Sequence, residues 1–245
     1  MKFRDMCIAV IVMVLLIVPA SQVHAGFGDV FKSIQKMIET GGGLSESEIV
    51  NGLKEALEIG TDNAVKIVSS VNGYYGNPEI RIPLPEPVRK MEKALRGVGF
   101  GSQVDAFELS MNRAAEQAAP EAGALFLETI KQMSFADARN ILEGEDNAAT
   151  LYFKEKTEIQ LGQTFKPIVH STMSEVGVTR IYQDLNTKVQ SIPFAGNLDM
   201  DLDQYVTDRA LDGLFLMLAE EERKIREDPA ARVTDLLKKV FNDKR

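Results

Sequence analysis

The sequence has no tryptophan, a single cysteine (Cys7) and only two histidines among its 245 residues. These numbers are too small for a zinc finger, a disulfide framework or an iron–sulfur cluster. Lys and Arg number 28 against 36 Asp and Glu, and the net charge of −8 argues against nucleic acid as a main partner. With 44% hydrophobic residues, the chain still has enough apolar side chains to form an ordinary folded core.

The first 25 residues have the pattern of a secretory signal peptide. Lys2 and Arg4 precede a thirteen-residue apolar run, and Val23-His24-Ala25 places small residues at the positions that a signal peptidase reads. The run is shorter than the about 20 apolar residues of a transmembrane helix. We predict cleavage after Ala25 and, for a Gram-negative source, a periplasmic protein; an uncleaved anchor is the alternative.

Removal of this segment takes away Lys2, Arg4, Asp5 and the cysteine, which leaves 26 basic and 35 acidic residues and one histidine. An exported chain without cysteine depends on its apolar core rather than on disulfides. No second apolar stretch approaches membrane length, so we expect a soluble protein without membrane contact after cleavage.

Apolar residues recur at helical spacing through most of the chain, and no strand-like alternation exceeds four residues. We predict an amphipathic helix and a Gly-rich hinge over residues 26–44, followed by a helical domain over residues 45–245. Capping patterns are expected to start helices at Ser102, with Asp105, and at Ser134, with Asp137. The predicted fold is an all-α, single-domain helical bundle of about eight to ten helices with one extended Pro-rich strap.

The centre of this bundle is predicted from a long helix over roughly residues 202–226. It contains five consecutive apolar residues, Leu214 to Leu218. Because successive residues of a helix point to every side, this run predicts burial on all faces. The expected neighbour is the alanine-rich helix around residues 114–119, since small side chains let two helix axes approach closely.

The strap is predicted between Tyr74 and Pro87, where four prolines interrupt the helical pattern. Proline fixes φ and removes a backbone donor, so an extended path is expected. We interpret the apolar side chains here as packing across the bundle; the alternative is a strap that covers a groove or docks a partner. The residues concerned are Tyr74, Tyr75, Ile80, Ile82 and Leu84.

Five groups of short phrases occur together in the order and spacing of a known family. They are GLKEAL at 52–57, NP at 77–78 with IPLP at 82–85, MNRAAE at 111–116, NAAT with YF over 147–153, and YVT, ALDGLF and AEEE over 205–222. In these phrases the chain resembles domain-of-unknown-function family 4197, a group of exported bacterial proteins, over about residues 45–241. The resemblance implies a signal peptide, a helical domain and no established activity, and it carries over no catalytic residue.

Motifs for nucleophilic, metal and nucleotide chemistry are missing. No Gly-x-Ser-x-Gly turn accompanies His170, which we interpret as a structural residue. Carboxylates alternate over residues 199–203 as at the start of a calcium loop, but Gln204 and Ala210 stand where that loop needs Gly and Glu. We interpret these aspartates as residues that start a helix. We therefore predict no metal site and no cofactor.

A polar cluster is predicted where the alanine-rich helix meets the long helix. Its members are Asn112, Arg113 and Glu116 on the former and Asp212, Glu220 and Glu221 on the latter. If the two helices are neighbours, Arg113 is expected to reach Asp212 or Glu220. Such a network would fix the helix register, which we favour, or form the polar end of a ligand pocket.

The missing catalytic groups favour a non-catalytic protein of the cell envelope that binds a partner protein or a hydrophobic small ligand. For the small ligand we expect a cavity between the long helix and the strap, whereas a filled contact there favours a protein partner. The alternative is a carboxylate-dependent hydrolase or lyase, for instance with Glu116 and Asp212, which needs a carboxyl of raised pKa beside a cleft. Attachment to a membrane surface through residues 27–38 is a weaker hypothesis, because acidic residues balance the lysines there.

Overall fold

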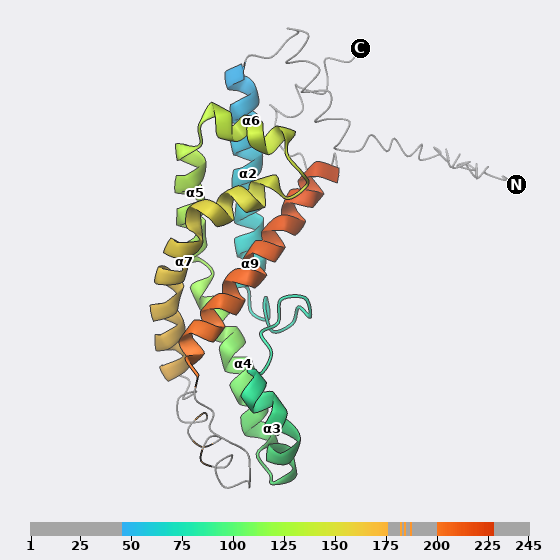
Figure 1. Cartoon of the computed structure of the whole chain (residues 1–245), viewed down its shortest axis with the longest axis vertical. Helices are drawn as coiled ribbons and strands as arrows, with labels where there is room; N and C mark the ends of the chain where they lie inside the picture. Colours follow the sequence, from blue (N-terminus) through green and yellow to red (C-terminus); the bar gives the residue numbers. More distant parts are fainter. Residues whose placement is uncertain (1–45, 176–181, 183, 185–186, 188–199, 228–245) are drawn as a thin grey trace, which may run out of the picture.

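The computed structural model describes residues 46–175, 182, 184, 187 and 200–227 (Figure 1). Over these residues the regular elements are all helices, which confirms the all-α class. They are α2 (Glu46–Ser69), α3 (Glu86–Gly97), α4 (Gly101–Ala118), α5 (Glu121–Gln132), α6 (Phe135–Glu143), α7 (Ala148–Glu175) and α9 (Leu202–Glu227). The predicted signal peptide, N-terminal helix and Gly-rich hinge lie outside the described residues. The total of eight to ten helices stays a prediction.

Helix α9 crosses the molecule diagonally and packs against α7, α2 and α4 (Figure 1). Helices α7 and α9 run antiparallel, because Thr150 at the start of α7 contacts Glu222 late in α9, and His170 late in α7 contacts Asp203 at the start of α9. Helix α3 packs on α4, and the two project together at the lower end of the view. None of the described helices has the combination of length and apolarity that a membrane span requires.

The apolar run of α9 lies in the core, with one exception. Leu214, Phe215, Met217 and Leu218 are at most 5% exposed, whereas Leu216 is 43% exposed. The prediction of burial on every side is therefore wrong for Leu216, because the helices packed on α9 leave that side open to solvent. Elsewhere the core is closed by aromatic contacts between elements, such as those of α5 and α7, where ring centroids lie 5.1 Å apart.

Two predicted helix starts have opposite outcomes. The capping box of α6 is confirmed, since the Ser134 hydroxyl accepts the Asp137 N–H at 3.1 Å and the Asp137 carboxylate accepts the Ser134 N–H at 3.0 Å. The cap predicted at Ser102 is wrong. Helix α4 begins at Gly101, and the Asp105 carboxylate instead accepts a hydrogen bond of 2.6 Å from Arg96 of α3. A charge-assisted bond to a guanidinium is stronger than a neutral cap, which explains the outcome.

The chain leaves α2 through a turn that requires glycine and then runs without helix to the start of α3. Asn72 has φ of 66°, in the left-handed region. A Cβ atom on Gly73 would collide with the carbonyl oxygen of Ile67. We call the non-helical stretch that contains this turn segment 70–85. That it acts as a single extended strap stays a prediction.

Candidate functional site

Asn112 of α4 binds segment 70–85 through its peptide backbone. Its Oδ1 accepts the Ile82 N–H at 2.8 Å, and its Nδ2 donates to the Ile82 carbonyl at 2.9 Å and to the Glu108 carbonyl at 2.8 Å. The residue is fully buried, so its side-chain amide has replaced water by protein partners. Leaving one such buried group unpaired costs about 1–3 kcal/mol. Asn112 therefore fixes the position of the segment on α4.

Glu116, one turn further along α4, holds the other end of the segment. Its Oε1 accepts the backbone N–H groups of Tyr74 and Tyr75 at 3.2 and 3.3 Å. Its Oε2 accepts a hydrogen bond from Arg113, whose second terminal nitrogen donates to Asn72 Oδ1 at 2.8 Å. Glu116 is 4% exposed, and the guanidinium and the two N–H groups compensate its buried charge. The carboxylate thus anchors backbone rather than facing a substrate.

Tyr74 fills the contact between the segment and α9. Its side chain is fully buried, and its hydroxyl donates to the Ala210 carbonyl at 2.7 Å. Burial, and secondly the negative charge of Glu116, raise the pKa of Tyr74, so the hydroxyl keeps its proton and remains a donor. A Cβ atom added to Gly213 of α9 would lie 2.7 Å from Tyr74 Cε1 and 3.0 Å from Ile80 Cβ. At this point the segment and α9 are in direct contact, without the cavity expected for a small hydrophobic ligand.

The other side chains predicted for the strap divide into buried and half-buried groups. Ile80, Ile82 and Leu84 are at most 6% exposed and belong to the core. Tyr75 is half-buried, and the Arg81 guanidinium lies 4.1 Å from the centre of its ring. Arg81 also forms an ion pair of 3.1 Å with Glu108 of α4. These contacts place the segment's apolar side chains inward, as the packing interpretation expects.

The polar residues of α9 do not join this cluster as predicted. Arg113 pairs with Glu116 and Asn72, so the expected contact with Asp212 or Glu220 is wrong. The Asp212 carboxylate is exposed, and its Oδ2 lies 3.6 Å from Nη1 of Arg209 on the same helix. The predicted contact does not form because Glu116, one turn away on α4, is already within reach of the Arg113 guanidinium.

Glu220 and Glu221 have separate surroundings. Burial raises the pKa of Glu220, and the adjacent Glu79 carboxyl of segment 70–85 raises it further, which favours the protonated form. Glu221 is 6% exposed; it accepts a hydrogen bond of 3.2 Å from Asn63 of α2 and one of 2.7 Å from Lys224. Glu220 thus lies beside segment 70–85, and Glu221 links α9 to α2.

Glu222 is an important buried residue that the sequence reasoning did not single out. It accepts the backbone N–H groups of Ala149 and Thr150 at 3.0 and 2.9 Å, and so caps the start of α7 from a distant helix. Its Oε1 also accepts two hydrogen bonds from Arg226, at 3.0 and 2.8 Å, and Arg226 donates to the Ile141 carbonyl at 3.1 Å. A usable signal existed, because the Glu222 and Arg226 positions continue the apolar face of α9 that includes Leu218.

An open groove of about 890 Å³ lies between α7 and α9. Its apolar lining includes Ile159 and Pro167 of α7 and Leu211 of α9. Ile159 is 79% exposed, although it is one of the large hydrophobic residues of the chain. Leu211 in the groove and Gly213 at the strap are two residues apart in α9, so the groove and the predicted pocket at the strap lie on opposite faces of this helix. Its lining was not predicted, apart from Asp212.

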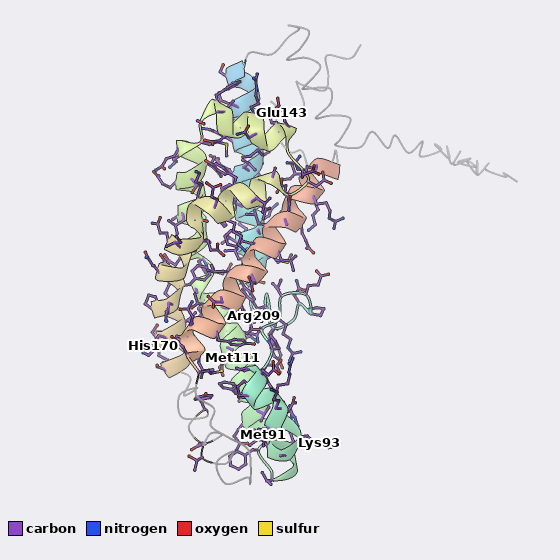
Figure 2. The ribbon with its side chains drawn as sticks, viewed as in Figure 1. Met91, Lys93, Met111, Glu143, His170 and Arg209 are labelled. Atoms are coloured by element: carbon purple, nitrogen blue, oxygen red, sulfur yellow. The ribbon has the colours of Figure 1, made fainter. Side chains whose placement is uncertain are left out.

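His170 and Lys166 close the end of this groove where α7 meets the start of α9. His170 Nδ1 lies 2.7 Å from Asp203 Oδ2, and Lys166 Nζ donates to Asp201 Oδ2 at 2.9 Å. Asp201 also accepts the Gln204 N–H at 2.9 Å, which confirms its predicted role as a helix-start residue. That backbone hydrogen bond, and then Lys166, lower the pKa of Asp201. Figure 2 shows His170 at the α7 edge and Arg209 on the far side of α9.

Metal chemistry has no support from the described part of the chain, where no group of three or more His, Cys, Asp or Glu side chains could hold an ion. A family model described as "Protein of unknown function (DUF4197)" matches residues 43–242. Comparison with curated proteins gave no match, and comparison with solved structures gave none either.

Proposed function

The chain belongs to the DUF4197 family, and from this premise we propose that it is an exported, non-catalytic protein of the cell envelope that binds a partner protein. The observation that carries this proposal is the α7–α9 groove with its strongly exposed Ile159. A single exposed apolar side chain is common on protein surfaces, but here Ile159 stands with Pro167 and Leu211 in one open groove, and such a groove is typical of a protein-binding site. The partner covers this side chain when it binds.

The use of the buried carboxylates supports a role without catalysis. Glu116 binds backbone N–H groups and Arg113, and Glu222 binds the start of α7 and Arg226. A general acid or base needs a proton that it can exchange with a substrate in a cleft. Glu116 and Asp212 have separate cationic partners, which weighs against a hydrolase or lyase that uses them as a pair. Glu220, whose pKa is raised, faces Glu79 and not the groove.

The contact at Gly213 supports a protein partner over a hydrophobic small ligand. Tyr74 and Ile80 occupy the space where a ligand cavity between α9 and the strap was expected. We therefore propose that segment 70–85 is a structural strap that ties α4 to α9. The binding surface is then the open groove on the other side of α9, which suits the side chains of a protein better than an enclosed ligand.

Native mass spectrometry of the protein purified gently from the envelope fraction tests this proposal. We expect a chain that begins at Gly26, after cleavage of the signal peptide, with its bare mass or in a complex with another polypeptide. An additional mass of a few hundred daltons that disappears on denaturation would contradict the proposal and identify a small-ligand carrier. A mass that retains residues 1–25 would contradict the predicted cleavage.

A further inference from the structure

The α7–α9 groove has the length and lining of a site for a helix of another protein. Its α7 side extends from Glu158 to His170, which corresponds to about 18 Å at 1.5 Å per residue. Ile159 and Leu211 supply apolar contacts from the two sides. At Gly162 the two helices approach closely, because a Cβ atom there would already be in van der Waals contact with Leu211 Cδ1, at 3.9 Å, so a partner would lie along the groove rather than between the helices. About three helical turns of a partner fit along this surface.

The charges beside this apolar strip are mainly negative. Glu158 lines the α7 side, where it pairs with Lys154 at 3.5 Å, and Asp203, Asp208 and Asp212 line the α9 side, where Asp203 and Asp212 have the partners described above. The Asp208 carboxylate accepts a hydrogen bond from the neutral amide of Gln204 at 2.7 Å. Of the lining residues, Lys166 carries a positive charge, and it already binds Asp201 and Gln204 at 2.9 and 3.0 Å.

We propose that the groove binds an amphipathic helix with an apolar face and flanking Lys or Arg residues, supplied by a partner protein. This inference rests on the proposed function and specifies its partner class. Apolar side chains of such a helix would cover Ile159 and Leu211, and its cations would approach Glu158 and Asp208. The charges favour encounter with a basic partner and oppose an acidic one, and salt weakens this preference.

Synthetic helical peptides and the full mature chain provide the test. One labelled 14-residue peptide carries Leu on one face and Lys on the other, a second replaces Lys by Glu, and a third scrambles the Leu–Lys sequence. Fluorescence anisotropy measures binding at low and high salt. We expect the amphipathic Leu–Lys peptide to bind at least about tenfold more tightly than the other two, with affinity falling as salt rises.

Variants of the groove have matched controls elsewhere on the chain. Ile159→Ser should weaken binding about tenfold, whereas Val71→Ser, at an equally exposed position (79% in both), should have no effect. The Glu158→Gln/Asp208→Asn double variant should weaken binding about fivefold. The Glu121→Gln/Glu128→Gln double variant on α5 makes the same change in net charge and should leave binding unchanged.

Equal binding of the Leu–Glu peptide, or equal effects of the groove and control variants, would overturn the inference. The inference would also be overturned if the protein bound none of the peptides but co-floated with anionic phospholipid vesicles in a flotation assay. These results are distinguishable from failure of the proposed function. If a protein partner is crosslinked at Ile159 but its contacting segment is not basic, the proposed function stands and this inference fails. If no protein partner is found at all, both fail.

Discussion

Replacement of Glu222 by alanine is expected to lower the free energy of unfolding by about 3–5 kcal/mol, the range for breaking a buried ion pair. The substitution removes the acceptor of two backbone N–H groups at the start of α7. It also removes the carboxylate that binds the Arg226 guanidinium, which is 9% exposed. Both losses occur where water cannot easily replace the missing partner.

Urea denaturation followed by circular dichroism measures this effect. Glu143→Ala is the control, since its carboxylate is exposed and lies 3.8 Å from Arg139, and we expect a change below about 0.5 kcal/mol. Glu222→Gln keeps an acceptor oxygen, so its loss of unfolding free energy should lie between the losses expected for Glu222→Ala and Glu143→Ala. It provides the test if the Glu222→Ala protein does not fold. Equal stabilities of the Glu222→Ala and Glu143→Ala proteins would show that the buried cluster does not support the fold.

Gly213→Ala should destabilise the protein by up to about 2 kcal/mol, which is the cost of overpacking a filled core, about 1–3 kcal/mol, less the gain in helix propensity. The new methyl group would lie 2.7 Å from Tyr74 Cε1, so either α9 or the Tyr74 ring must shift, which disturbs the packing around the Tyr74–Ala210 hydrogen bond. The cost of overpacking exceeds the gain of up to about 1 kcal/mol that alanine brings to a helix interior. The segment and α9 are therefore coupled through one glycine.

The matched control for this prediction is Gly123→Ala in α5. No atom lies within 4 Å of a Cβ placed there, so the helix propensity of alanine should stabilise the protein by about 0.5–1 kcal/mol. Thermal unfolding of both variants compares the signs of the two changes. A stabilising Gly213→Ala substitution would mean that the contact between Tyr74, Ile80 and α9 is looser than described.

Features coded by neighbouring residues were predictable from the sequence. The Ser134–Asp137 box starts α6 as predicted, and α9 begins at Leu202 with Asp201 at its cap. The turn after α2, which ends at Ser69, falls at Asn72-Gly73, and an Asn-Gly pair is itself a strong turn signal. In each case a short-range hydrogen bond or a left-handed φ determines the outcome, so local sequence is sufficient.

Features that depend on which helices meet were not predictable. Asn112, Arg113 and Glu116 were correctly grouped by their helical spacing, but their partners are backbone groups of segment 70–85 rather than carboxylates of α9. From the sequence alone, the polar cluster and the strap are two separate candidate sites. The helical spacing places Glu222 on the buried face of α9, but no local pattern identifies its partner at the start of α7, more than 70 residues away.

The central claim, that a protein partner covers the α7–α9 groove, is tested most directly by site-specific photo-crosslinking in cells that express the full chain. A photoreactive residue replaces Ile159 in one protein and Val71 in the other, two positions that are both 79% exposed. We predict one identified polypeptide crosslinked from Ile159, absent from Val71 and reduced by the Glu158→Gln/Asp208→Asn change. The same crosslinked products from both positions, or none from Ile159, would contradict the claim.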